Sequence, residues 1–178
     1  MLIKDMTRDR CIDLLKSAHI GHIACTAGLQ SYVTPFSFAY GKDFLYCFGT
    51  VGKKIQWMRA NPLVCVEVEN IVSREEWHTL VIQGRYEELP DTPQLAHEID
   101  TAHDLLAKSA VWWEPGYSRT LNAGGERPIE FIWFRVSILE ISGHQAIPDK
   151  PVVQSVSALT AARRTVSRYL RTWASALE

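Results

Sequence analysis

Two adjacent lysines stand where a glycine-rich turn leads into a helix, and their position suits them to binding an anion. The stretch GTVGKKIQWMRANP, residues 49–62, places Lys53 and Lys54 after two glycines and ahead of an amphipathic run that a proline ends. The start of an α-helix presents unpaired backbone N–H groups and about half a positive charge, so it attracts phosphate. Two ammonium groups and the hydroxyl of Thr50 would add donors at the same place. The pattern predicts a site for a terminal phosphate.

The same pattern has a second interpretation that involves no ligand. Its spacing differs from the G-x-x-x-x-G-K-[ST] motif of a nucleotide-binding P-loop. Two neighbouring lysines on a turn commonly point into solvent, so the pair by itself does not decide between a phosphate site and a solvated surface. The surrounding elements must decide.

No metal site is predicted from the histidines, cysteines and acids. His19, His22 and Cys25 are spaced by three, and a strand, whose successive side chains point to opposite faces, cannot bring all three together. We interpret them as structural. A second set has helical spacing and is interpreted as a solvated helix face: His97, Asp100, His103 and Asp104.

The composition of the chain limits the function classes. With 178 residues, of which 47% are hydrophobic, one ordinary core and a single compact body are expected. The formal charge of −1, from 19 basic and 20 acidic residues, gives no overall field for a nucleic acid. The four cysteines lack C-x-x-C spacing and no signal segment precedes them, which indicates reduced thiols and a cytoplasmic protein. No window approaches the ~18 consecutive apolar residues of a membrane span.

Hydrophobic patterning predicts strands separated by short helices. A helix is expected after Thr7, the expected N-cap. Further helices are expected within residues 49–62, 92–110 and 157–176. The runs with strand character are residues 19–27, 31–40, 43–49, 63–69, 77–89 and 129–143. Five or six antiparallel strands with inserted helices predict a small closed or partly closed barrel.

Two local features are singled out within these elements. Gly84 lies inside a strand run, which indicates a bulge or the close approach of another backbone. Residues 111–128 contain proline, glycine and three aromatics and are expected to form a long loop, which is commonly functional or mobile. Its Trp112, Trp113 and Tyr117 suit closing over a ligand, packing at a subunit interface or packing in the core.

From about Thr7 to Gly143 the order of parts resembles the FMN-binding split-barrel superfamily that contains pyridoxamine 5′-phosphate oxidase. It looks most like the small oxidase-related branch that includes nitroimidazole reductases. The resemblance is carried by IGHIACTAGLQSYVTPFSFAY, LYCFGTVGKKIQWMRANPLVCVEVE and WHTLVIQGRYEEL. It implies a mainly β fold with α (α+β), a six-stranded antiparallel split β-barrel with peripheral helices over residues 1–144. Residues 145–178 would form a C-terminal extension with one helix, packed on the same domain or on a dimer partner.

The resemblance also implies an FMN site shared between two subunits of a homodimer. Lys53 and Lys54 take the places of the basic pair that binds the FMN phosphate. The second strand would run along the isoalloxazine and ribityl chain, the end of the third strand would touch the cofactor, and Thr79 would reach the flavin of the neighbouring subunit. The candidate cofactor-binding residues are Tyr32, Val33, Thr34, Pro35, Phe36, Ser37, Cys47, Phe48, Thr50, Lys53, Lys54 and Thr79.

The implied activity is reduction of a small organic acceptor, such as a nitroaromatic or quinone, with NAD(P)H as donor. Phe48 stands where many nitroimidazole-reductase-like relatives carry histidine, so no catalytic side chain is assigned. Tyr32 and Ser37 replace the basic residues with which the oxidase holds a phosphorylated pyridine, which disfavours pyridoxamine phosphate as the substrate. The alternatives left open are a protein that binds deazaflavin F420 or haem, and a flavin-binding module without turnover.

Overall fold

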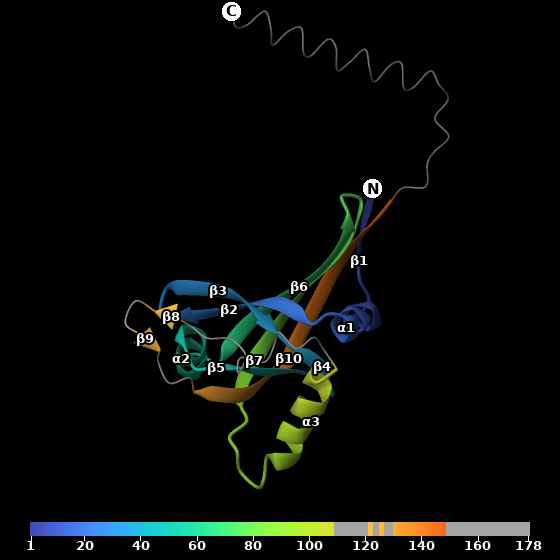
Figure 1. The fold of residues 1–178 in the computed structure, drawn as a ribbon. Helices are drawn as coiled ribbons and strands as arrows, with labels where there is room; N and C mark the ends of the chain where they lie inside the picture. Colours follow the sequence, from blue (N-terminus) through green and yellow to red (C-terminus); the bar gives the residue numbers. More distant parts are fainter. Residues whose placement is uncertain (109–120, 123–124, 127–129, 149–178) are drawn as a thin grey trace, which may run out of the picture.

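The computed structural model describes residues 1–108, 121–122, 125–126 and 130–148, which form a mainly antiparallel sheet with peripheral helices (Figure 1). The helices are α1 (Arg8–Ser17), α2 (Lys53–Ala60) and α3 (Ala96–Leu106). The first strands are β1 (Leu2–Asp5), β2 (Ile20–Ala27), β3 (Gln30–Ser37), β4 (Ala39–Gly41) and β5 (Phe44–Thr50). The later strands are β6 (Leu63–Ser73), β7 (Glu76–Glu88), β8 (Leu121–Asn122), β9 (Gly125–Glu126) and β10 (Phe131–Ile147).

One residue joins the two ends of the main sheet. The strand order is β3-β2-β6-β7-β10-β5-β4, with β1 added beside β10. β3 and β4 stand at opposite ends of this order, yet only Phe38 separates them in sequence. The sheet must therefore curl until its ends meet. Phe38 is fully buried and stacks on Phe36 with ring centroids 5.4 Å apart, and its N–H donates to His19 O at 3.1 Å.

The predicted split barrel is confirmed by this arrangement. The six long strands β2, β3, β5, β6, β7 and β10 correspond to the six predicted runs. The predicted run 31–40 breaks at Phe38, where the chain passes from one end of the sheet to the other. Two short features were not predicted: β1, whose four residues are all exposed and so show no alternation, and the β8–β9 pair inside the expected loop 111–128.

The predicted hairpin turns have the backbone that tight turns need. Gly28 has φ +58° between the paired residues Ala27 and Gln30. Lys42 and Asp43 both have positive φ, 51° and 65°, as a type I′ turn requires. These two turns fix the register of β2 against β3 and of β4 against β5.

Gly84 lies at a close approach of two strands, as its position in the sequence suggested. A Cβ atom at Gly84 would lie 2.6 Å from Val136 Cγ1 and 2.8 Å from Ser137 O. The register of β10 against β7 shifts between Ile138 and Glu140, just beyond the pairing of Ile138 with Gly84. The extra residue of this bulge therefore lies in β10, and the absence of a side chain at Gly84 allows the two strands to approach closely there.

The helices cover the barrel from outside. Thr7 caps α1 by accepting a hydrogen bond from Arg10 N at 3.4 Å, which confirms the predicted N-cap. α1 buries Cys11, Leu14 and Leu15 against the barrel core. Within the described ranges, no helix has the length and apolar character needed to cross a bilayer.

The far ends of β6, β7 and β10 project from the barrel and, together with β1, form an arm (Figure 1). β10 continues to Ile147, three residues past the predicted domain end at residue 144, because β1 pairs with it there: Leu2 faces Ile147. The predicted helix over residues 157–176 and the aromatic residues Trp112, Trp113 and Tyr117 lie outside the described residues.

Candidate functional site

Within the described residues, no side-chain hydrogen bond caps the N-terminus of α2. Gly52 occupies the N-cap without a side-chain hydrogen bond, and the first turn contains no acidic residue. A Cβ at Gly52 would meet no atom of the described residues within 4 Å, so the space beside this glycine is open. None of the ion pairs among the described residues involves Lys53 or Lys54. The backbone donors of the helix start and two lysines that pair with no carboxylate among the described residues therefore lie at the same end of α2.

The two lysines point in different directions from this place. Lys54 is half-buried, and its Nζ lies 5.9 Å from the ring centroid of the core residue Phe134. Lys53 is exposed, and its Nζ lies 4.8 Å from the Tyr32 ring centroid and 4.5 Å from that of Trp57. One ammonium group therefore faces the barrel and the other faces a surface aromatic pair.

Burial changes the acidity of the inner lysine. Loss of solvent lowers the pKa of Lys54, and the nearby thiols of Cys47 and Cys25 act in the opposite direction. Desolvation disfavours the charged form of an amine, and a nearby anion restores it. A bound phosphate would therefore interact strongly with Lys54, since little water competes for the ammonium group.

The second predicted segment of the site, Tyr32 to Ser37, lies on an end strand of the sheet. Ala27 and Gln30 flank a two-residue turn, so their backbones form a hydrogen-bonded pair. Further along β2 and β3, pairs that are not hydrogen-bonded to each other alternate with hydrogen-bonded pairs. This alternation directs the backbone groups of Val33, Pro35 and Ser37 away from β2. Pro35, which has no N–H, sits at one of these outward positions. The strand edge can thus offer amide and carbonyl groups to a ligand.

The side chains of this segment divide between two faces. Phe36 is buried in the core and Tyr32 and Thr34 are partly buried on the same face, whereas Val33 and Pro35 are exposed on the other. Phe36 is therefore available to a ligand only through its backbone. Tyr32 differs, because its ring also lies beside the α2 lysine described above.

The side chains of the third predicted segment, at the end of β5, also point to different sides of the sheet. Cys47 is fully buried, which strongly raises the pKa of its thiol, so its side chain is not available to a ligand. Phe48 points the other way and packs against Trp133 and Phe131, with ring centroids 4.4 Å and 5.6 Å away. Thr50 is exposed and ends β5, three positions before α2 begins.

Thr79 lies far from the start of α2 of its own chain. It pairs with Glu69 and His144 in the arm, whereas Glu88, nine positions further along β7, bonds Arg59 of α2 at 2.6 Å. Nine residues of strand span roughly 30 Å at about 3.3 Å per residue. Contact between Thr79 and a ligand of the neighbouring subunit stays a prediction.

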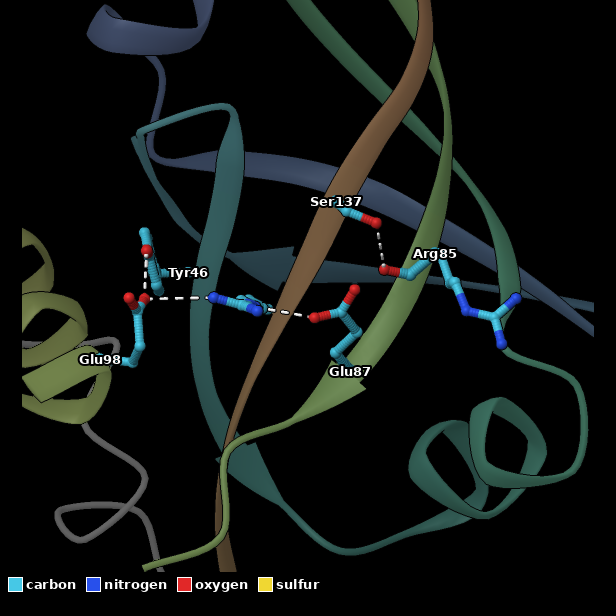
Figure 2. A network of polar contacts seen from close by, with 6 residues as sticks. Tyr46, Arg85, Glu87, Glu98 and Ser137 are labelled. Atoms are coloured by element: carbon cyan, nitrogen blue, oxygen red, sulfur yellow. Dashed lines mark hydrogen bonds and ion pairs between the residues drawn. The ribbon is translucent and has the colours of Figure 1, made fainter. Parts of the chain in front are cut away.

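A polar network attaches α3 to the outer face of β5 and β10 (Figure 2). Leu105 and Leu106 of the same helix pack with Phe48 and Trp133. Tyr46 Oη donates to Glu98 Oε2 at 2.8 Å, and Arg135 Nη1 donates to the same oxygen at 3.2 Å. Arg135 Nε donates to Glu87 Oε2 at 2.9 Å. Burial, followed by the Glu98 hydrogen bond, raises the pKa of Tyr46 to about 12, and the Tyr46 hydrogen bond is the main cause that lowers the pKa of Glu98.

Two of the histidines that were considered for metal binding each lie near a single carboxylate. His22 Nδ1 lies 3.3 Å from Glu67 Oε2, and His103 Nδ1 lies 3.7 Å from Asp104 Oδ1. In the part of the chain that the structure describes, no three histidine, cysteine or acidic side chains are grouped as a metal ion would need.

The sequence did not identify two residues that contact the lysines. Trp57 stands one helical turn after Lys53, so its spacing of four could have been used to place it on the same face. Phe134 contacts Lys54 only because β10 pairs with β5. No local pattern connects Phe134 with α2.

Comparisons with known proteins agree with this architecture. The family model for pyridoxamine 5′-phosphate oxidase matches residues 7–145. An uncharacterized protein of Rhizobium meliloti strain 1021 is 34% identical over 146 residues, which are 82% of this chain and 97% of that protein.

Solved structures show the same fold. The crystal structure of an FAD-binding protein from Mesorhizobium loti aligns with a TM-score of 0.69 and 35% identity, over 83% of this chain and 99% of that one. An FAD binding protein from Mycobacterium smegmatis, 19% identical, aligns with a TM-score of 0.59 over 82% of this chain and 100% of that one. The resemblance found in the sequence is confirmed, and the chain belongs to the pyridoxamine 5′-phosphate oxidase family of split-barrel proteins.

Proposed function

We propose that this protein is a flavoprotein that binds FMN with its phosphate at the N-terminus of α2. The observation that carries the proposal is the uncapped helix start at Gly52, where Lys53 and Lys54 have no carboxylate partner among the described residues. Helix N-termini of this kind are ready-made phosphate sites. The FAD-binding descriptions of the similar structures support a flavin, because FAD contains the FMN moiety.

The residues present fit a flavin phosphate and ring. The phosphate carries negative charge that two ammonium groups and the helix dipole would stabilise. The outward backbone groups of β3 suit the polar edge of a flavin ring. Phe48 and Trp133 supply an aromatic surface next to α3, which supports a planar, uncharged acceptor.

We further propose that the protein reduces a small organic acceptor of the nitroaromatic or quinone type with NAD(P)H. A bound flavin supplies the hydride and electron chemistry in such enzymes. The chain's own residues would bind the phosphate, orient the ring and shape the acceptor pocket. Phe48 offers no proton at its position, so the proposal assigns no general acid or base to it.

The proposal includes a homodimer and a cytoplasmic location. Several apolar side chains of the arm are exposed, and contact with a second copy would bury them. They are Leu2, Ile3, Ile71, Val72 and Ile147. A dimer through the arm would also allow Thr79 to reach the partner's flavin. The four free cysteines support the cytoplasmic location.

The test begins with the visible spectrum of the purified protein after incubation with FMN. The bands of bound oxidised flavin are expected, and bleaching by NADH or NADPH in the absence of acceptor would support turnover. Replacing both Lys53→Ala and Lys54→Ala should remove most of the flavin while far-UV circular dichroism stays unchanged. Lys4→Ala with Lys108→Ala, which removes the same charge elsewhere, should retain the flavin.

Other outcomes would identify the alternatives. A Soret band without flavin bands would indicate a haem protein, and selective uptake of deazaflavin F420 would indicate an F420 protein. Bound flavin that neither nicotinamide bleaches would support a binding module without turnover. Full flavin occupancy in the double lysine variant would contradict the proposed phosphate site.

A further inference from the structure

We propose that a surface pocket between α1 and the arm binds a small hydroxycarboxylate. The volume of the pocket is about 160 Å³. A cavity of about 150 Å³ in another protein holds one benzene molecule, so the ligand would have roughly six to eight non-hydrogen atoms. FMN is several times larger, so the pocket is distinct from the phosphate site proposed at the start of α2. The two sites can therefore be tested independently.

One face of α1 forms the first wall of the pocket. Its residues follow the i, i+3, i+4, i+7 spacing that aligns side chains along one side of a helix. They are Arg10, Asp13, Leu14 and Ser17. Leu14 is buried against the barrel core, and the other three residues are polar and exposed. α1 lies beside the base of the arm (Figure 1), so these polar groups border the ends of β6 and β7.

Two residues of the arm form the opposite wall. Asn70 of β6 and His78 of β7 are direct partners in the sheet register, so their side chains lie on the same face of the sheet. Thr79, the next residue of β7, points to the other face because successive side chains of a strand alternate. The pocket therefore lies on the face opposite to the one from which Thr79 is predicted to reach the partner's flavin.

The hydrogen-bonding groups of His78 and Arg10 are not paired within the chain. His78 Nδ1 is buried and has no hydrogen-bond partner among the described residues. Buried polar atoms almost always have a partner, so this nitrogen beside a polar pocket indicates a ligand. None of the ion pairs of the described ranges involves Arg10. Asn70 adds an exposed amide that can donate as well as accept.

The pocket also contains hydrogen-bond acceptors. Ser17 Oγ donates to Leu14 O at 3.0 Å, so its lone pairs remain to accept a hydrogen bond. Asp13 Oδ1 lies 3.7 Å from Lys16 Nζ, which offsets part of the carboxylate charge. A ligand carboxylate would bind the Arg10 guanidinium through charge-assisted hydrogen bonds, and a ligand hydroxyl would donate to Ser17 or Asp13. A hydroxycarboxylate therefore satisfies both kinds of group.

An NMR titration of the isotope-labelled full chain, with FMN present, tests this site. Addition of 3-hydroxybutyrate should shift the signals of the Asn70 side-chain amide and the Ser17 backbone N–H. A dissociation constant of about 1 mM is expected, which is within reach of a ligand of this size. Butyrate, which lacks the hydroxyl, should bind about threefold more weakly, and 3-hydroxybutyramide, which lacks the charge, at least about tenfold more weakly.

The titration can contradict each part of the proposal. If neither signal shifts at about 50 mM 3-hydroxybutyrate, far above the expected dissociation constant, the pocket does not bind this class of ligand. Equal affinities for 3-hydroxybutyrate and its amide would overturn the assignment of a carboxylate. Equal affinities for 3-hydroxybutyrate and butyrate would overturn the assignment of a hydroxyl.

Two substitutions locate the carboxylate. Arg10→Gln removes the unpaired guanidinium and should weaken 3-hydroxybutyrate at least about tenfold. Asn70→Asp keeps the shape of the side chain and adds a negative charge, which should also weaken binding. Arg85→Gln makes the same change as Arg10→Gln at an exposed residue near the other end of β7, and it should bind as the unmodified protein does. Unchanged affinity in both pocket variants would overturn the proposal.

His78→Leu separates ligand binding from stability. It should weaken 3-hydroxybutyrate at least about threefold, because leucine cannot form a hydrogen bond. Without the ligand, the unfolding temperature should equal or exceed that of the unmodified protein, because the nitrogen that is removed has no partner among the described residues. A lower unfolding temperature with unchanged 3-hydroxybutyrate affinity would show a purely structural histidine and contradict its proposed role.

Discussion

Lys54 shows how burial changes what one side chain does. Its ammonium group is half-buried beside Phe134 and the thiol of Cys47, and loss of solvent lowers its pKa. A lysine with a lowered pKa loses its charge at a lower pH than an exposed lysine. Because phosphate binding favours the charged form, affinity and protonation are coupled at this residue.

We therefore expect flavin affinity to depend on pH through Lys54. As the pH is raised toward 10.5, the ordinary value for lysine, the dissociation constant for FMN should increase, because the neutral amine no longer attracts the phosphate. Arginine stays charged over this pH range, so the Lys54→Arg variant should show a much smaller increase in the dissociation constant. The comparison distinguishes the effect of Lys54 deprotonation from the effect of flavin ionisation, which is the same for both proteins. Identical pH profiles for the two proteins would exclude this role of Lys54.

At the scale of elements, α3 is attached to the sheet by a charged network rather than by apolar packing alone. Arg135, with its side chain 19% exposed, bonds Glu98 of α3 and Glu87 of β7, and its guanidinium lies 4.0 Å from the Phe44 ring centroid. Leu105 and Leu106 of α3 pack near Phe48 and Trp133. The network therefore fixes the helix that borders the aromatic surface of the candidate site.

The network predicts a loss of stability at both ends of the pH range. The lowered pKa of Glu98 contributes stability that is present above its ordinary value of 4.5 and is lost as pH falls through the folded-state value. The raised pKa of Tyr46 contributes stability that is present below 10 and is lost as pH rises from 10 to about 12.

Glu98→Gln should remove the acid-side part of this dependence. The expected loss is about 1–2 kcal/mol in the free energy of unfolding at neutral pH, because a hydrogen-bonded charge is replaced by a neutral amide. Urea denaturation at neutral and acidic pH measures the loss, which should shrink as the pH falls. Asp100→Asn, an exposed acid of the same helix, should change stability little. A cost of Glu98→Gln that does not vary with pH would show that the carboxylate charge is not what matters.

The sequence predicted the elements better than it predicted their contacts. Much of β2, β3, β6, β7 and β10 alternates between buried and more exposed residues, so their periodicity was visible locally, whereas β5 was recognised from its aromatic and apolar composition. The four exposed residues of β1 have no alternation, and the break at Phe38 depends on how the sheet curls. The lysine pair was also visible locally, whereas its division between Phe134 and the Tyr32–Trp57 pair depends on strands that meet only in the folded barrel.

At the scale of the whole molecule, the proposed homodimer would form through the arm. Its exposed apolar residues include Ile71 and Val72 near the turn between β6 and β7. The net charge of −1 opposes the association of two copies only weakly. These properties agree with the proposed homodimer. Because the net charge is close to zero, the positive charge of the proposed phosphate site is local to Lys53 and Lys54.

Ile71→Asp combined with Val72→Asp should weaken the dimer, because two charges would have to be buried between the arms. Light scattering after size exclusion measures the mass. The unmodified protein is expected at twice the chain mass of 20.2 kDa, and the variant should shift toward the monomer. Leu29→Asp, on the exposed turn between β2 and β3, should leave the dimer unchanged. A monomeric unmodified protein would contradict the proposed assembly.

The central claim is that the start of α2 holds a flavin phosphate, and the affinity of the unmodified protein for FMN relative to riboflavin tests it most directly. The two ligands share the ring and ribityl chain and differ only in the phosphate. With two charged hydrogen-bonding groups and the helix start contributing, riboflavin should bind at least about 100-fold more weakly than FMN. Affinities for the two ligands within about threefold of each other would contradict the claim.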